Sequence, residues 1–267
     1  MRLYLASTSP ARRALLAQTG IEPVLVAPGV DEDAAVAATA SALGRALTGP
    51  ELVALLAEAK AAAVADATTP VDGFVFGGDS AFEVDGVLYG KPHDPDVARE
   101  RWRQMLAAGG GTLWSGHCVI DRRVPSSVPT VPSSAPTGGP GGAGRAGTVP
   151  PVRTVDASGG GPLGLAGSFG DVAPGGSGLV ASGDRVVAVD SAVLTFADDM
   201  SAEEIDAYVA TGEPLEVAGA FTIDGRAAAY ITRIDGAPSA VVGLSLPVLR
   251  SMLLRGFGIA WHDLWAL

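Results

Sequence analysis

The sequence predicts an α/β protein, because short apolar segments typical of buried strands alternate with well-capped helical segments. The chain has 267 residues, including 36 Gly and 19 Pro. Residues 124–180 hold 15 Gly and 9 Pro but neither Lys nor Glu, so the excess is concentrated in one low-complexity insert. The remaining residues, about 210, are enough for one core or two small lobes without disulfides.

The first elements are predicted by clear start and stop signals. Residues 3–6 form a short apolar strand. Ser9 and Pro10 are a favourable N-cap and first residue for a helix that ends near residue 19, before Gly20. A strand that passes directly into a helix is the basic unit of an α/β fold.

Similar signals predict the later elements. Gly49-Pro50 precedes a helix over 51–66, and Asp85-Gly86 is a type I′ turn pair inside a hairpin over 82–89. Ser201 begins a helix with Glu204 at capping-box spacing. The other expected elements are strands over 23–26, 74–76, 113–121, 185–196 and 228–234, and helices over 94–107 and 246–255.

Charge and composition exclude several classes of protein. The net charge is −11, whereas proteins that bind nucleic-acid polymers need surplus positive charge. No apolar run approaches the roughly 18 residues that span a bilayer, so we expect no membrane segment. Cys118 is a lone cysteine, and the three histidines lack zinc-ligand spacing. We therefore expect a cytoplasmic protein in a reducing compartment.

The segment Ser7-Thr8-Ser9-Pro10 places hydroxyl side chains where a strand passes into a helix. Unpaired backbone N–H groups and the positive end of the helix dipole meet there, which suits an anion. Arg12, in the first turn, can add a guanidinium to a phosphate. A capped helix with two solvated arginines explains the same residues, and the local pattern leaves both interpretations open.

A second candidate site is Gly77-Gly78-Asp79-Ser80, which follows the expected strand over 74–76. A carboxylate beyond the carboxyl end of a strand lies where α/β folds bind ligands. Glycines allow close backbone approach, and Asp79 can activate water or hold a metal ion. An ordinary glycine-rich turn is the alternative.

The two lysines, Lys60 and Lys91, stand out in a chain whose other basic residues are all Arg. A compact ammonium binds phosphate as a point charge and is not interchangeable with guanidinium, so both are candidate phosphate ligands, with chance as the alternative. The acidic run Asp31-Glu32-Asp33 can ligate Mg²⁺ together with substrate phosphates, or can be a solvated loop.

Taken together and in this order, the motifs resemble those of the Maf family, over nearly all of the chain outside residues 124–180. The resemblance rests on Ser7-x-Ser9-x-x-Arg12, Val30-Asp31-Glu32, Glu58-Ala59-Lys60-Ala61, Gly78-Asp79-Ser80, Gly90-Lys91-Pro92 and, beyond the insert, on residues 201–205, 211–215, 218–221 and 241–247.

The resemblance implies a mixed sheet in two lobes around a nucleotide-binding cleft, often in a dimer. It also implies a nucleoside triphosphate pyrophosphatase, which hydrolyses (d)NTPs, non-standard ones included, to monophosphate and pyrophosphate. Such an enzyme uses Mg²⁺ or Mn²⁺, and the family has a proposed link to septum formation. Asp79 matches the family's proton acceptor. The other site residues that we expect are Ser7, Ser9, Arg12, Lys60, Lys91 and Ser80 for substrate, and Glu32 with Asp79 for the metal.

Several positions depart from the family pattern. Ala11 replaces the first of two arginines, Ser80 a common Thr and Asp224 a common Gln. Those three positions are tied to base preference in the family's defined subgroups, so the sequence does not assign the base. Gly111 and Val217 also stand where His and Lys are common.

The alternative function is a nucleotide-binding regulator of cell division with little turnover. An intact Asp79 with both lysines argues against it, because binding alone requires no base. We expect a single domain over 1–267, in which the insert enlarges a connection between two strands. Its composition predicts no packed core of its own, so deletion of about 130–178 is expected to leave folding and basal hydrolysis intact.

Overall fold

The computed structural model describes residues 1–67, 71–124, 152–154 and 163–266. Its strands are β1 (Leu3–Ala6), β2 (Val24–Val26), β3 (Phe74–Val84), β4 (Val87–Tyr89), β5 (Gly110–Asp121), β6 (Val152–Thr154), β7 (Ser177–Ser182), β8 (Arg185–Phe196) and β9 (Ile231–Asp235). Its α-helices are α1 (Pro10–Gln18), α2 (Glu32–Leu43), α3 (Gly49–Ala65), α4 (Pro95–Ala108), α5 (Ala202–Ala210), α6 (Pro238–Val241) and α7 (Leu246–Phe257), and the 3₁₀ turns include η1 (Gly164–Phe169).

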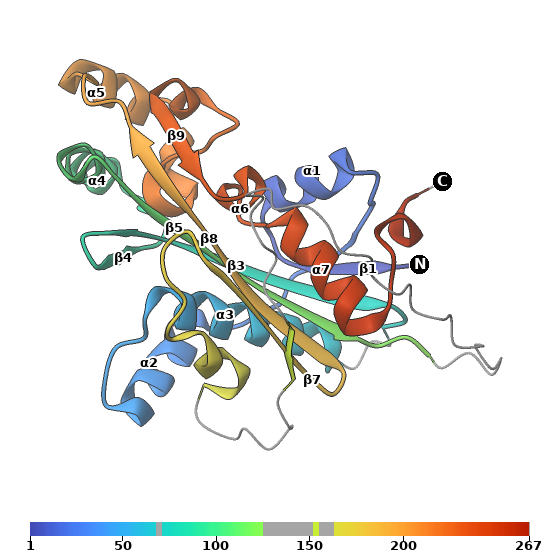
Figure 1. Ribbon diagram of the computed structural model, residues 1–267. Coiled ribbons are helices and arrows are strands. Elements are labelled where there is room, and N and C mark those ends of the chain that lie inside the picture. The colour runs from blue at the N-terminus through green and yellow to red at the C-terminus, as the bar shows by residue number, and fades with distance from the viewer. Residues whose placement is uncertain (68–70, 125–151, 155–162, 267) are drawn as a thin grey trace, which may run out of the picture.

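Within these residues the strands form one mixed, nine-stranded sheet of order β2-β1-β3-β5-β8-β7-β6, with β4 added to β3 and β9 to β8 (Figure 1). β1 is parallel to β2 and β3, whereas β3, β5, β8 and β7 pair antiparallel. The mixed α/β sheet predicted from the sequence is therefore confirmed. No helix in the described residues is long and apolar enough to cross a bilayer.

The capping and turn signals act as the sequence predicts. The Ser9 hydroxyl accepts the Arg12 N–H at the start of α1, and Ser201 and Glu204 form both bonds of a capping box at the start of α5. Asp85 and Gly86 have φ values of 48° and 79°, as the turn between β3 and β4 requires. Local chemistry thus fixes these element boundaries.

Three element boundaries differ from expectation by three residues or more, and one of them is the start of β5, at Gly110 instead of residue 113. β3 continues through residues 77–80 to Val84, because the whole stretch pairs with β5, so Asp79 lies within a strand and not in a turn after it. The strand expected over 228–234 begins only at Ile231, since residues 226–230 form a 3₁₀ turn.

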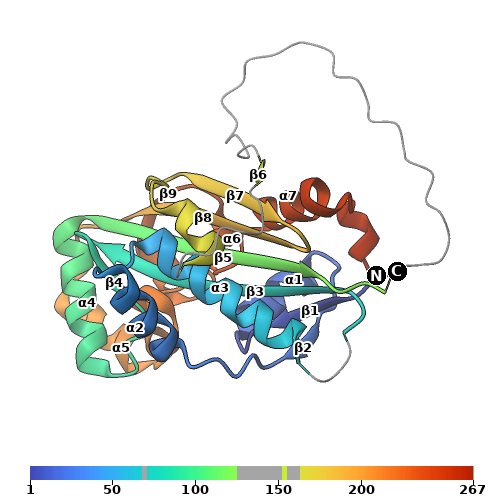
Figure 2. The same cartoon turned by 90° about the horizontal axis from the view of Figure 1, so that it is seen from below.

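Three long strands, β3, β5 and β8, connect two groups of helices. α1 and α7 lie toward one end, whereas α4 and α5 lie at the other end, and α3 runs along the sheet (Figures 1 and 2). On one face of these strands an apolar cluster around Phe76 packs under α7, and a separate cluster around Phe82 packs against α4 and α5. The molecule is thereby divided into two lobes that share one sheet.

A row of polar residues separates the two apolar clusters. Ser80 of β3 is opposite Ser115 of β5, which in turn is opposite Asp190 of β8. Directly opposed residues share a face of the sheet. We call Ser80, Ser115 and Asp190 the polar row; it marks the boundary between the lobes.

The expectation that residues from about 130 to 178 can be deleted without loss of folding conflicts with the last part of this segment, which packs on the core of the main domain. Leu165 and Phe169 of η1 are 8% and 1% exposed and belong to the apolar cluster that packs around α3. β7 begins at Ser177 and pairs with β8. A deletion of about 130–178 would therefore remove core residues; most of its first part lies outside the described residues.

We predict that Phe169→Ala lowers the free energy of unfolding by about 3–5 kcal/mol, because it leaves a cavity against α3. Urea unfolding followed by circular dichroism measures this change. Leu254→Ala on α7 is the matched control, because Leu254 is 41% exposed and its truncation leaves no cavity in the core. Equal losses in the two variants would contradict the assignment of Phe169 to the core.

Candidate active site

The candidate site lies where β3 changes partners along its outer edge. β1 pairs with residues 74–77 of β3, and β4 pairs with residues 82–84. Within the described chain, no strand pairs with this edge over residues 78–81. β1 ends there and its chain continues as Ser7, so side chains from both faces of the sheet can reach one open edge.

On one face of the sheet, Lys60 joins two carboxylates. Lys60 Nζ lies 2.7 Å from Asp79 Oδ1 and 2.9 Å from Glu32 Oε1. The Lys60 and Asp79 side chains are 9% and 14% exposed, whereas that of Glu32, the first residue of α2, is 47% exposed. Three expected site residues thus meet around one ammonium group.

The close approach of α3 to β3 explains how Lys60 reaches Asp79. A Cβ on Gly77 would lie 2.6 Å from the Ala61 backbone nitrogen and would collide with the Ala57 carbonyl oxygen. Glycine is therefore required at residue 77 for helix packing. The sequence predicted close backbone approach at these glycines, and at Gly77 it is α3 that approaches; the alternative of an ordinary turn is wrong, because residues 77–80 belong to β3.

From the other face, Arg12 reaches the same edge. Its Nε donates to the Gly243 carbonyl at 2.7 Å, Nη1 to Ser7 Oγ at 3.2 Å and Nη2 to Ser80 Oγ at 3.0 Å. Arg12 is 8% exposed. Its three acceptors are neutral oxygens, so their hydrogen bonds orient the guanidinium without neutralising its charge.

Burial and the neighbouring opposite charges have opposing effects on the pKa values of Asp79 and Arg12. Burial raises the pKa of the Asp79 carboxyl above its ordinary value, and the charges of Lys60 and Arg12 oppose that rise. Burial also lowers the pKa of Arg12, while Asp79 and Glu32 oppose that change. Asp79 therefore holds a proton more readily than an exposed aspartate does.

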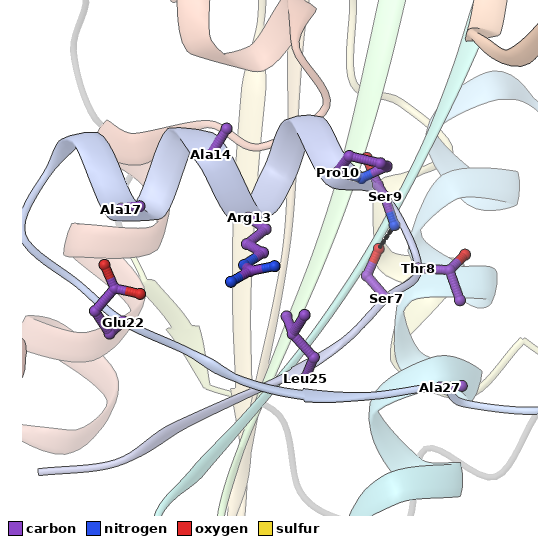
Figure 3. A pocket seen from close by; sticks show the side chains of 10 residues that line it. All are labelled: Ser7, Thr8, Ser9, Pro10, Arg13, Ala14, Ala17, Glu22, Leu25 and Ala27. Atoms are coloured by element: carbon purple, nitrogen blue, oxygen red, sulfur yellow. Dashed lines mark hydrogen bonds between the residues drawn. The ribbon is translucent and has the colours of Figure 1, made fainter.

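Ser9 and Ser7 organise the turn that precedes α1. The Ser9 N–H donates to Ser7 Oγ at 3.2 Å, as Figure 3 shows. This turn also borders a pocket of about 630 Å³ between α1 and the β2 segment, into which Arg13 and Leu25 project. Arg12, Lys60, Glu32 and Asp79, which we call the charged cluster, do not line this pocket.

Lys91 takes a different position. Its side chain is 51% exposed, and its Nζ lies 3.7 Å from Glu216 Oε2. His93 Nδ1 lies 3.2 Å from Oε1 of the same glutamate. The structure thus places Lys91 beside Glu216 and His93, beyond the β3–β4 hairpin, and not in the cluster of Lys60.

Gly243 is a site residue that local sequence signals miss. Its φ is +95°, and a Cβ there would lie 2.8 Å from Ser80 Oγ and 3.2 Å from Arg12 Nη2. A side chain would displace the guanidinium, so only glycine fits. The 241–247 motif contains this residue, but the motif alone does not indicate its contact with Arg12.

The positions that depart from the family pattern lie in different surroundings. Ser80 binds Arg12, whereas the Asp224 carboxylate accepts a hydrogen bond from the Thr222 hydroxyl in a partly exposed turn. Ala11 is on α1, next to Arg12. Of these three residues, Ser80 alone has a direct hydrogen bond to the charged cluster among the described contacts.

Comparison with known proteins now decides the family. The profile of a family described as "Maf-like protein" matches residues 2–135 and 172–256, most of the chain. The chain belongs to the Maf-like family. The interruption in the Maf-like match, between residues 135 and 172, is shorter than the predicted insert and leaves β7 inside the matched region.

Curated Maf-like relatives align over nearly the whole chain. A nucleoside triphosphate pyrophosphatase of Leifsonia xyli subsp. xyli is 45% identical over 99% of this chain and 97% of its own length. Proteins of the same name from Streptomyces coelicolor and Nocardia farcinica are 37% and 39% identical, and each alignment covers at least 98% of this chain and 95% of the relative.

We predict that Asp79→Asn raises the stability of the protein at neutral pH. The pKa of Asp79 is raised in the folded state, so the folded protein binds more protons than the unfolded chain at pH values between the two pKa values. Stability therefore falls as pH rises through that window. Urea unfolding at pH 7 and near pH 4 measures the difference, which is expected to shrink at the lower pH.

Asp121→Asn is the control with the opposite sign. Burial alone would raise the pKa of Asp121, but hydrogen bonds and charge from Arg123 bring it below its ordinary value. Its replacement is therefore expected to lower stability at neutral pH. A loss of stability at pH 7 in Asp79→Asn as well would contradict the account of burial at residue 79.

Proposed function

We propose that this chain is a nucleoside triphosphate pyrophosphatase, which hydrolyses nucleoside triphosphates to monophosphate and pyrophosphate. The single observation that carries the proposal is the buried guanidinium of Arg12, held by neutral oxygens beside Asp79 and Lys60. A buried cation without a bonded carboxylate suits an anionic ligand, because an unpaired buried charge is costly. The shared name of the curated relatives supports the same activity.

The site combines binding groups with a base. Arg12 has five N–H donors and uses three on the protein, which leaves donors for phosphate oxygens. The Ser7 to Ser9 turn and the N-terminus of α1 add backbone N–H groups and a hydroxyl. We assign Lys91, on the hairpin side of the edge, to the outer phosphates.

Asp79 is the proposed proton acceptor. Lys60 binds Oδ1, and we assign Oδ2 to the attacking water. The water oxygen bonds to the α-phosphorus, the bond from that phosphorus to the bridging oxygen breaks, and pyrophosphate leaves with the electron pair. The water proton passes to Asp79, whose raised pKa makes it a better acceptor than an ordinary aspartate.

The residues at the edge also fit a divalent cation such as Mg²⁺ or Mn²⁺. The described residues contain no group of three or more His, Cys, Asp or Glu side chains arranged for a metal. Mg²⁺ nevertheless binds through one or two carboxylates completed by substrate phosphates and water, and Glu32 and Asp79 supply two. When bound, such an ion would stabilise the charge that develops on the phosphate oxygens.

The test of this proposal is a panel of standard and modified nucleoside triphosphates, incubated with the protein and Mg²⁺ or Mn²⁺, with product identification. Monophosphate and pyrophosphate are expected, and Asp79→Asn should lower kcat by about 10²- to 10⁴-fold. Asp199→Asn, an exposed aspartate on the surface, is the control. Orthophosphate as the product, or nucleotide binding without any product, would overturn the proposal.

Arg12→Gln tests the binding role separately. We predict that it weakens binding of inorganic tripolyphosphate about 10- to 100-fold, because a buried charge-assisted hydrogen bond contributes more than a neutral one. Titration calorimetry measures the affinity. Arg13→Gln is the matched control, since Arg13 is the exposed neighbour on α1. A larger loss for Arg13 than for Arg12 would place the anion in the α1–β2 pocket instead.

A further inference from the structure

The segment over residues 240–245 crosses the sheet at the polar row. Ser115 Oγ donates to the Ala240 carbonyl at 2.7 Å, and the Ser245 N–H donates to His117 Nε2 at 2.8 Å. The Ser245 hydroxyl interacts with Asp190, and it accepts the Val248 N–H at 3.4 Å at the start of α7. Ser115 and His117 are fully buried, and Asp190 is 9% exposed. Buried polar groups of β5 and β8 thus hold both ends of this segment.

The middle of the segment meets the candidate site. The Gly243 carbonyl accepts the Nε–H of Arg12 at 2.7 Å, two residues before the backbone N–H that His117 binds. Because residue 243 has no room for a side chain against Arg12 and Ser80, a small displacement of the segment changes the position of the guanidinium.

The other ring nitrogen of His117 gives an independent indication that this position needs a polar side chain. Its Nε2 accepts a hydrogen bond, so the proton must be on Nδ1. In the described part of the chain, buried Nδ1 has no partner at hydrogen-bond geometry, although backbone groups of Ser115 and Ala188 interact with the ring. An apolar side chain would avoid that cost, which is about 1–3 kcal/mol for a buried unsatisfied group. The bond from Ser245 to Nε2 gives a reason for a histidine here.

The surroundings keep this ring neutral. Burial and, to a smaller extent, the nearby charge of Arg12 lower the pKa of His117 to about 3. The ring stacks at a tilt near Phe76, with centroids 5.9 Å apart. A neutral ring remains a hydrogen-bond acceptor across the physiological range of pH.

We propose that His117 is a positioning residue for Arg12. Its Nε2 fixes the backbone of Ser245, and the Gly243 carbonyl in the same turn sets the orientation of the guanidinium at the open edge of β3. His117 itself touches no substrate. The inference rests on the proposed function only in taking Arg12 as a ligand of the triphosphate.

The test compares two variants of similar shape. In His117→Gln the side-chain oxygen can accept the Ser245 N–H, whereas in His117→Met a side chain of similar length offers only a weak sulfur acceptor. Each is combined with Arg12→Gln to complete a double-mutant cycle. The readouts are the affinity for inorganic tripolyphosphate, kcat and KM for hydrolysis, and the thermal unfolding midpoint.

We expect His117→Met to weaken tripolyphosphate binding about 10-fold, and His117→Gln to stay within about threefold of the parent protein. In the Arg12→Gln background His117→Met should have no further effect. A merely structural role would instead weaken binding equally in both backgrounds, and that result would overturn the inference. Should His117→Met fail to fold, His117→Gln still tests the inference, because a loss of binding well beyond threefold in a variant that keeps an acceptor for the Ser245 N–H would overturn it.

The experiment separates failure of this inference from failure of the proposed function. Tripolyphosphate binding that depends on His117 only through Arg12, without hydrolysis of any nucleotide, would support the inference and refute the pyrophosphatase activity. Nucleotide hydrolysis, together with equal losses of binding from His117→Met in the parent protein and in Arg12→Gln, would support the pyrophosphatase activity and refute the inference. Absence of tripolyphosphate binding by the parent protein would refute the anion-binding role of Arg12 and the inference with it.

Discussion

The candidate site depends on the absence of a strand partner for residues 78–81 along one edge of β3, within the described chain. β1 pairs with β3 as far as Gly77, and β4 begins to pair at Phe82. The open edge between them admits Lys60 with Glu32 from the side of α3, and Arg12 from the side of α1. A continuous edge partner would separate these two groups by a strand. Because no described strand pairs with this part of the edge, charged side chains from both faces of the sheet can gather at one site.

The charges of this site explain how a protein with a net charge of −11 can receive a polyanion. Lys60 and Arg12 are buried at the edge; the two carboxylates pair with Lys60, whereas the described hydrogen bonds of Arg12 go to neutral oxygens only. Fixed cations in a partly buried site attract phosphate more strongly than exposed ones in water. The cost is the burial of Asp79, which raises its pKa, and the same burial makes it a better proton acceptor.

Much of the fold was predictable from local chemistry, and the rest depended on contacts between distant segments. Ser9 and Pro10 gave the start of α1, and Asp85-Gly86 gave the hairpin. The expectation that the strand before Asp79 ends at Phe76 was wrong, because β5 pairs with it far beyond that residue. Phe169 was not predicted to be a core residue, because the glycine-rich composition around it does not show that η1 packs on α3.

The site was predictable where residue type alone limits the chemistry. Lys60 contacts both Asp79 and Glu32, and Arg12 contacts the neighbouring Ser80, whereas Lys91 lies beside Glu216. Their catalytic and binding roles stay predictions. Gly243 and His117 were missed as site residues because their roles depend on which segment lies above the sheet. No local pattern gives that information.

The most direct test of the whole account is a crystal structure of the protein with an α,β-methylene nucleoside triphosphate and Mg²⁺. The account predicts that phosphate oxygens bind the guanidinium of Arg12 at the open edge of β3, with the α-phosphorus as the phosphorus nearest to Asp79. A triphosphate bound elsewhere with the bonds of Arg12 to Ser80 and Gly243 untouched, or one that presents its γ-phosphorus to Asp79, would contradict it.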